Sequence, residues 1–393
     1  MSSSSSKADL ISHSYWRLSG FYLFYFASIG ALIPFWGLYL QSLGFDAQQI
    51  ATVFAVIMGT KIIAPNIWAW IADLTGKRML IIRLASLCSL LSFLLVFNVD
   101  TYSQMLLVML CFSFFWNANL PQFEAVTLNY LGENTNRYSA IRLWGSLGFV
   151  LVVIVLGILF EQLGIQILPI IISGLLLAIC ISSWLVKEKN KTSHSLDKIS
   201  LLSVLRNPVV FAFLAVCFLL QASHGPYYAF YSIFLEQQGY ARGLIGQLWA
   251  LGVIAEIVIF LMMHQLLKKF TVRQLLFIAL LLTSIRWLLI GHIVDSLFLL
   301  VLAQTLHAAS FGLFHAVSIH LIHQFFPGAV QGRGQALYSS VSFGAGGAFG
   351  AMYCGYTWQN YAPSVSFDIA AVISFLALIL TWLFVHNKST EKR

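Results

Sequence analysis

The sequence contains a long succession of apolar segments, each of a length that can cross a lipid bilayer. The hydrocarbon core of a bilayer requires about 20 apolar residues per helix. Twelve such segments lie at roughly residues 17–40, 50–71, 79–98, 104–131, 138–160, 165–186, 208–235, 244–266, 274–293, 297–323, 334–358 and 364–386. Only 9% of all residues are charged, whereas soluble proteins carry about 25%. The sequence therefore predicts an all-α polytopic membrane protein with twelve transmembrane helices.

The longest polar break, residues 187–207, separates six apolar segments from another six. It predicts two bundles, at 17–186 and 208–386, joined by a cytoplasmic linker at 187–207. We expect residues 1–16 to form a disordered cytoplasmic tail, because they lack the apolar core and cleavage site of a signal peptide. Residues 387–393 are predicted to form a second cytoplasmic tail.

Positive charges are concentrated in alternate loops. They gather around residues 77–83, 187–206 and 268–273 and at the C-terminus, whereas the opposite loops contain only Arg242. Basic residues mark cytoplasmic loops, so we expect both termini in the cytoplasm and the protein in a bacterial-type inner membrane. The net charge of +8 therefore indicates membrane topology and not a nucleic-acid partner.

The sequence offers no sign of a metal centre, a cofactor or an enzyme active site. Its five cysteines are scattered through apolar segments without a CxxC pair, which predicts neither a disulfide nor a metal site. Neither HExxH nor GxSxG occurs. We therefore expect no catalytic residues, and a membrane-embedded enzyme or sensor is the least favoured function.

The two halves of the chain resemble each other at a shift of 195 residues. This shift places Gly44 on Gly239 and Lys61 on Glu256. A six-helix unit duplicated in parallel is the plan of major-facilitator transporters, whose substrates bind between the halves near the bilayer midplane. The repeat therefore predicts a pseudo-twofold arrangement of two six-helix bundles around a central site.

Several charged residues are predicted to lie inside the membrane, where they are costly and usually functional. Lys61 and Glu256 each lie about twelve residues into a helix, or roughly 18 Å, and a direct contact between them is one possibility. Glu124 and Arg142 form a second predicted pair. Arg286 requires an acid, and Glu256 is the nearest candidate in sequence. The alternative for each pair is a static ion pair that only holds helices together.

Uncharged polar residues extend this set of candidates. Asn117 and Asn119 are expected to bind substrate, because amides rarely face lipid. His224 precedes Gly225-Pro226, which interrupts the helix over 208–235 and suggests a wet cavity. Further candidates are Tyr228 for substrate binding and His307 and His315 for proton transfer, since imidazole titrates near neutral pH. Ordinary packing is the alternative for each of them.

The segment Ala72–Arg78, ADLTGKR, lies in the loop after the second predicted helix. It partly fits the GxxxDRxGRR-like signature of major facilitators through Asp73, Gly76 and Arg78, and departs from it at Ala69 and Leu74. The resemblance implies a cytoplasmic latch that pairs with a neighbouring helix end. We therefore expect these residues to control conformation and not to bind substrate.

The segments YSAIRLWGSLGFV, LLQASHGPYYAFYSIF, GQLWALGVIAEIVIF and SIRWLLIG resemble the 3-phenylpropionate permease group of major facilitators. That group is similar in turn to lactose permease and to nucleoside–proton symporters. The resemblance implies that Glu124 and Arg142 help to bind substrate, and that Glu256, Arg286 and His307 act in binding and proton coupling. Ser310 replaces the proton-binding glutamate of lactose permease, so the resemblance leaves the proton carrier open.

The resemblance and the intramembrane charges together predict a secondary transporter that works by alternating access. The expected substrate is a small organic solute such as 3-phenylpropionate, whose carboxylate Lys61 would neutralise, taken up with a proton. The proton would be the coupling ion, and the substrate and the lipid bilayer would be the partners of a monomeric protein. Proton symport of sugars or nucleosides, and export, remain alternatives.

Overall fold

The computed structural model describes residues 2–132, 134, 137–188 and 204–385. Within these ranges the chain is almost entirely helical and has no strand, which confirms the predicted all-α class. The tail at 387–393 and most of the linker at 187–207 lie outside the described residues.

The first half of the chain forms six long helices. They are α1 (Ser2–Ser42), α2 (Ala47–Thr75), α3 (Arg78–Leu94, continued by a 3-10 turn Leu95–Asn98), α4 (Tyr102–Leu131), α5 (Tyr138–Leu163) and α6 (Leu168–Leu185). Helix α1 begins at Ser2, so the prediction of a disordered tail over residues 1–16 is wrong for the described part of that segment. The chain there continues the hydrogen-bonded turns of the transmembrane helix.

The second half contains more and shorter elements. They are α8 (Pro208–Ser223), α9 (Gly225–Gln237), α10 (Arg242–Lys269), α11 (Val272–His292), α12 (Leu297–Thr305), the π-helix η4 (Ala308–Leu313), α13 (Phe314–Phe325), α14 (Gln331–Ser339), the π-helix η6 (Ser340–Gly346), α15 (Gly347–Asn360) and α16 (Pro363–Phe384). The break between α8 and α9 falls at His224, next to Gly225-Pro226, as predicted.

Eleven of the described helices are long and apolar enough to cross a membrane, against twelve predicted. The segment that is not among them is 334–358. Its chain is helical from Gln331 to Asn360, with the π-helix Ser340–Gly346 between two α-helices, but its many glycine and serine residues make it less apolar than the other segments. π-Helical turns inside α-helices occur frequently at functional sites, and both described π-helices lie in the second half.

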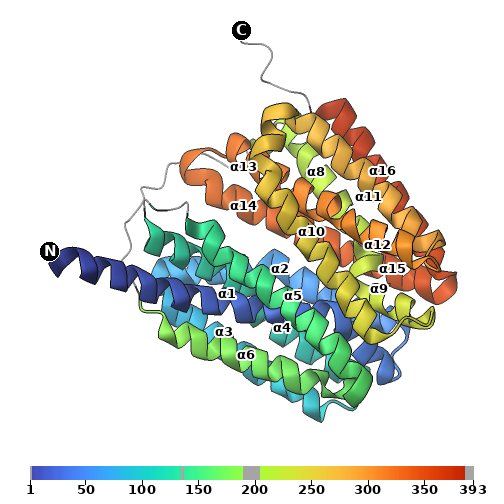
Figure 1. Cartoon of the computed structure of the whole chain (residues 1–393), viewed down its shortest axis with the longest axis horizontal. Helices are drawn as coiled ribbons and strands as arrows, with labels where there is room; N and C mark the ends of the chain where they lie inside the picture. Colours follow the sequence, from blue (N-terminus) through green and yellow to red (C-terminus); the bar gives the residue numbers. More distant parts are fainter. Residues whose placement is uncertain (1, 133, 135–136, 189–203, 386–393) are drawn as a thin grey trace, which may run out of the picture.

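Figure 1 shows the two halves as separate groups of helices that lie at an angle to each other. They are joined chiefly where α5 packs against α10, where α2 packs against α15 and the π-helix η6, and where α1 packs against α9. Glycines permit these close approaches: a Cβ added to Gly157 of α5 would lie 2.6 Å from the carbonyl oxygen of Arg242 in α10. A Cβ added to Gly355 of α15 would lie even closer to the side chain of Ala51 in α2.

These glycine contacts lie at one end of the molecule, opposite the ends of α1 and α16 at which the chain begins and finishes. We call it the closed end; it contains residues 42–47, 157–163, 237–243 and 355–360. Tight backbone contact here joins the two halves. Transport by alternating access requires such an end to open and close in turn.

Candidate functional site

Lys61 lies on the side of α2 that faces the second half. Phe54 lies seven residues, or about two helical turns, earlier and shares that side. Its ring and Ala229 of α9 both lie beside Gly37 of α1. The Lys61 side chain is half-buried, and its ammonium lies 3.6 Å from the sulfur of Met58. Among the described residues it has no carboxylate partner within 4.0 Å, so its charge is available to a ligand.

Asn117 of α4 lies beside this lysine. Its amide donates hydrogen bonds to the backbone oxygen of Ile57 (3.0 Å) and to the hydroxyl of Thr60 (2.8 Å), both in α2. Thr60 also donates to Ser113 of α4 at 3.0 Å. This network fixes the rotation of α2 and hence the direction in which Lys61 points.

Asn119 points the other way. Its amide oxygen accepts a hydrogen bond from Ser86 of α3 at 3.0 Å, and its nitrogen donates to Phe115 of its own helix. The side chain is fully buried between α3 and α4. The expectation that Asn119 binds substrate is therefore corrected, because both ends of its amide are used in helix packing.

Glu124 and Arg142 lie near each other without forming a direct ion pair within 4.0 Å in the described structure. Glu124 accepts a hydrogen bond from the hydroxyl of Tyr138 at 3.2 Å. The Arg142 guanidinium stacks 3.7 Å from the ring centroid of Phe26 in α1. Arg142 interacts electrostatically with Glu124 and also with Glu256 of the second half, so it connects the charges of both bundles.

Arg286 is fully buried and is bound by neutral groups. Its guanidinium donates to the backbone oxygen of Ala303 (3.0 Å), the hydroxyl of Ser310 (3.0 Å) and the amide oxygen of Gln304 (3.4 Å). It also lies over the ring of Tyr227, 4.2 Å from the centroid. The expected pairing with Glu256 is wrong, since no carboxylate contacts this arginine within the described residues.

Glu256 instead lies against His307. The carboxylate oxygen is 3.8 Å from Nε2 of the imidazole, and the two side chains are only 14% and 7% exposed. Two glycines make room for them, because Gly252 of α10 packs on the imidazole and Gly312 of η4 packs on the methylene groups of Glu256. The direct contact with Lys61 that the sequence left open is absent from the described structure, and His307 takes that place.

Two buried imidazole nitrogens lack a hydrogen-bond partner among the described residues. They are Nδ1 of His307 and Nε2 of His224. His224 bonds through Nδ1 to the backbone oxygen of Leu220 (2.9 Å) and stacks on Tyr228. An unpartnered polar atom in a buried position is uncommon and indicates a site for a proton, water or ligand atom. His315 is satisfied, because its Nδ1 bonds to the hydroxyl of Tyr338 at 3.0 Å.

Sequence reasoning missed Gln304 of α12, a central residue of the second half. Its amide oxygen accepts from Tyr227 at 3.2 Å and from Arg286, while its nitrogen donates to the hydroxyl of Tyr231. The signal was present as a lone glutamine three residues before His307 in an apolar segment. Tyr227 and Tyr231, which were not among the candidates, belong to the same network.

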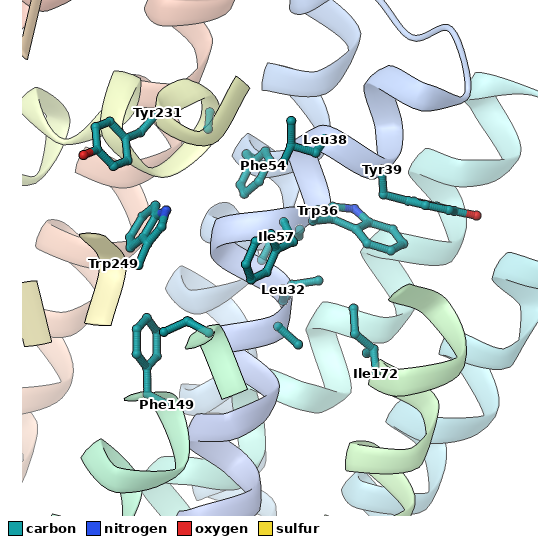
Figure 2. Close-up of a cluster of buried hydrophobic side chains, with 14 of the residues drawn as sticks. Leu32, Trp36, Leu38, Tyr39, Phe54, Ile57, Phe149, Ile172, Tyr231 and Trp249 are labelled. Atoms are coloured by element: carbon teal, nitrogen blue, oxygen red, sulfur yellow. The ribbon is translucent and has the colours of Figure 1, made fainter. Parts of the chain in front are cut away.

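Aromatic side chains gather where the two halves meet. Figure 2 shows Phe149 of α5 pointing toward Trp249 of α10, with Tyr231 of α9 above Trp249 in this view and Phe54 of α2 to the right of them. These side chains belong to one buried cluster that continues from one half to the other. Trp249 also donates to Ser232 at 2.9 Å. Phe54 and Trp249 lie seven residues, or about two helical turns, before Lys61 and Glu256 on the same helices and therefore nearer the closed end.

The segment 72–78 forms a compact turn at the end opposite the closed end. Asp73 and Arg78, the first residue of α3, form an ion pair of 2.7 Å. Gly76 ends α2 in the left-handed conformation at φ +68°, which favours glycine over other residues. Glu188, beyond α6, accepts from the backbone nitrogen of Met79 at 3.2 Å. This ties α2, α3 and α6 together, away from the intramembrane charges.

Comparison with known proteins identifies the family. Residues 15–369 match the model of the MFS_1 like family. The chain belongs to this family of major facilitators. It is 27% identical over 379 residues to a probable 3-phenylpropionic acid transporter of Escherichia coli (strain K12), covering 93% of this chain and 96% of that protein. A maltose permease of Geobacillus stearothermophilus is 26% identical over 372 residues, covering 92% of each chain.

Solved structures show the same fold. The nucleoside transporter NupG superposes with a TM-score of 0.83 at 17% sequence identity, covering 95% of this chain and 99% of that one. The protein is therefore a multi-pass membrane transporter of the major facilitator fold and not an enzyme. Lys61, Arg142 and Glu256 lie on α2, α5 and α10, which pack across the interface of the two bundles, whereas Glu124 lies on α4 within the first bundle.

Proposed function

We propose that the protein imports a small aromatic carboxylate, such as 3-phenylpropionate or a related acid, together with a proton. The observation that carries this proposal is Lys61, a half-buried cation in the membrane that lacks a carboxylate partner in the described structure. A buried charge normally has a partner, and the carboxylate of a substrate would supply one.

The charge balance of the central region supports an anionic substrate. Three cations, Lys61, Arg142 and Arg286, are present with only two carboxylates, Glu124 and Glu256. The difference, three minus two, leaves one positive charge for the substrate to neutralise. The aromatic side chains around Phe149 and Trp249 suit a phenyl ring, since aromatic pairs gain stability beyond their buried area.

The pair Glu256 and His307 is our candidate for proton coupling. A carboxylate that is almost wholly removed from water favours its protonated form unless a cation stays close. Arg142 is such a cation, and it acts on Glu124 as well. A substrate carboxylate bound to Lys61 and Arg142 would weaken the electrostatic attraction between Arg142 and Glu256. The Glu256 carboxylate would then take up a proton more readily. Loss of the proton on the other side would then release the substrate.

We propose further that the protein acts as a monomer in a bacterial-type inner membrane. The end opposite the closed end, where both termini lie, would then be in the cytoplasm. The strong concentration of basic residues at that end supports this orientation. No cofactor other than the coupled proton is required by the mechanism. The closed end would then face the outside, and the described state would receive or release substrate on the cytoplasmic side.

Transport of an uncharged sugar is the second candidate, since a maltose permease is among the relatives. Glu124 and Arg142 would then bind hydroxyl groups, because carboxylates and guanidinium groups both form strong hydrogen bonds with them. The free ammonium of Lys61 has no role in that function. For this reason the carboxylate remains our first proposal.

The test is uptake of radiolabelled 3-phenylpropionate into proteoliposomes, with and without an inward proton gradient. We expect accumulation above the external concentration only with the gradient, and none in liposomes without protein. Equal uptake under both conditions would refute proton coupling. Competition by maltose but not by unlabelled 3-phenylpropionate would favour the sugar. Substrate that leaves the vesicles against its gradient would indicate export.

A further inference from the structure

The closed end contains a hydrogen bond that joins the two halves at the first turn of α10. The carboxylate of Glu161, near the end of α5, accepts from the backbone nitrogen of Gly243 at 2.6 Å. Gly243 is the second residue of α10, so its N–H is one of the four that a helix leaves without an internal partner. Glu161 therefore caps this helix from the opposite bundle.

The first residues of α10 cannot provide such a cap themselves. Its N-cap residue is Ala241, which makes no side-chain hydrogen bond to the helix. The repeat shift of 195 places Ala241 on Asp46, the N-cap of α2. Asp46 accepts from the backbone nitrogen of Gln49 at 2.8 Å and forms a complete capping box with it. The second half has thus lost the local cap that the first half keeps.

The two caps differ in their dependence on conformation. Asp46 and Gln49 lie on one helix, so their bonds persist whether the closed end is shut or open. The bond from Glu161 exists only while α5 and α10 are together. Arg242 reinforces this dependence, because it bonds to Glu236 of its own half at 2.6 Å and to the backbone oxygen of Phe160 in the other half at 3.3 Å.

We propose that Glu161 is a positioning residue for transport that sets the balance between the shut and open states of the closed end. Opening this end removes the cap of α10, and nothing in α10 replaces it. The capping bond therefore stabilises the shut state relative to the open state. Arg242, the first residue of α10, extends the same contact to a second backbone group.

A second hydrogen bond joins the two halves at the closed end, but it is not needed to cap a helix. Gln359 of α15 accepts from the backbone nitrogen of Ala47, the first residue of α2, at 3.1 Å. This bond also joins the two halves, but α2 keeps the cap from Asp46 when it breaks. The free-energy difference between the two states should therefore depend more on Glu161 than on Gln359.

The test measures distances between spin labels on opposite halves of the closed end. The labels are placed at the exposed positions Gln162→Cys and Gln238→Cys, in full-length protein whose five native cysteines are replaced by alanine. In Glu161→Ala, the ratio of long to short distances should rise roughly fivefold, the shift that a typical N-cap produces in a two-state equilibrium. Glu161→Gln keeps an acceptor oxygen and should stay close to the parent ratio.

A second variant separates this role from simple stabilisation of the helix. Ala241 has an extended conformation, φ −65° and ψ 146°, similar to that of Asp46. Ala241→Asp in the Glu161→Ala background should cap α10 locally in both states. We expect the thermal stability to return to that of the parent while the ratio of distances stays raised. The double variant also allows the measurement if Glu161→Ala is poorly folded.

Two results would overturn the proposal. One is an unchanged distance ratio in Glu161→Ala. The other is a double variant in which the stability and the distance ratio both return to the parent values, because Glu161 would then act only on the helix end. The measurement needs no substrate, so it stands independently of the transported solute.

Discussion

Helices α2 and α10 are the same element of the duplicated unit. They differ at the N-cap, where Asp46 corresponds to Ala241, and at the charge inside the membrane. They begin at Ala47 and Arg242, which are 195 residues apart, and the same shift relates Lys61 to Glu256. The first helix carries a cation without a carboxylate partner in the described structure. The second carries an anion that lies against His307. In the proposed mechanism, one position of the repeat thus provides a binding charge in one half and a proton-exchanging charge in the other.

The surroundings of the two charges explain this division. Lys61 lies beside a network that is complete without it, formed by Asn117, Thr60 and the backbone of α2. Glu256 lies against the imidazole of His307 and against Gly312. A residue that stays outside its local network is free to meet a ligand, whereas an enclosed carboxylate responds mainly to protons. The comparison can be tested one helix at a time.

The largest effect is expected for Glu256→Gln, which keeps the shape of the side chain but removes its exchangeable proton. Accumulation driven by a proton gradient should fall by roughly 100-fold, the upper range of coupling between two sites. Exchange of labelled for unlabelled substrate across proteoliposomes should continue, because it requires no net proton movement. Asp100→Asn, at an exposed loop residue, is the control. Full accumulation in Glu256→Gln would remove Glu256 from the coupling mechanism.

The next effect is expected for Lys61→Ala. The KM for the carboxylate substrate should rise roughly 10- to 100-fold, the loss expected for a hydrogen bond to a charged group. Lys61→Arg should retain part of the affinity, and Lys269→Ala, at the end of α10, should retain all of it. Uptake kinetics and competition by the uncharged amide of the substrate provide the measurement. Equal losses for acid and amide would show that Lys61 does not recognise the carboxylate.

A smaller effect is expected at the beginning of α2. Asp46→Ala removes a cap that exists in both conformations, so the free energy of unfolding should fall by about 1 kcal/mol. The spin-label distance ratio at the closed end should not change, in contrast to Glu161→Ala. Unfolding in mixed micelles and the same distance measurement provide the comparison. A raised ratio in Asp46→Ala would mean that the two helix ends do not differ as proposed.

The smallest effect is expected for Asn119→Ala, between α3 and α4. Side-chain hydrogen bonds between membrane helices contribute about 0.6 kcal/mol on average, and the stability should fall by a similar amount. The KM should remain that of the wild type, because Asn119 bonds only to groups within its own bundle. A changed KM with unchanged stability would return Asn119 to the binding site.

The sequence by itself determined the fold class, the division into two halves and the set of membrane charges. These follow from hydropathy and from the repeat, because apolar length decides which segments enter the bilayer. The interruption beside Gly225-Pro226 was predictable too, since it depends on local backbone chemistry. The glycine-rich segment Ser340–Gly346 shows the limit of this approach, because its π-helical turn reflects packing against α2 and α8.

Only the tertiary structure decided which charges meet. Hydropathy leaves the rotation of each helix about its axis undetermined, and that rotation depends on close contacts between helices far apart in the chain. Arg286 consequently faces Gln304 and Ser310 and not the nearest acid in sequence, and Asn119 faces α3. The bond from Glu161 to α10 is of the same kind, since it joins two helices whose approach no local pattern specifies.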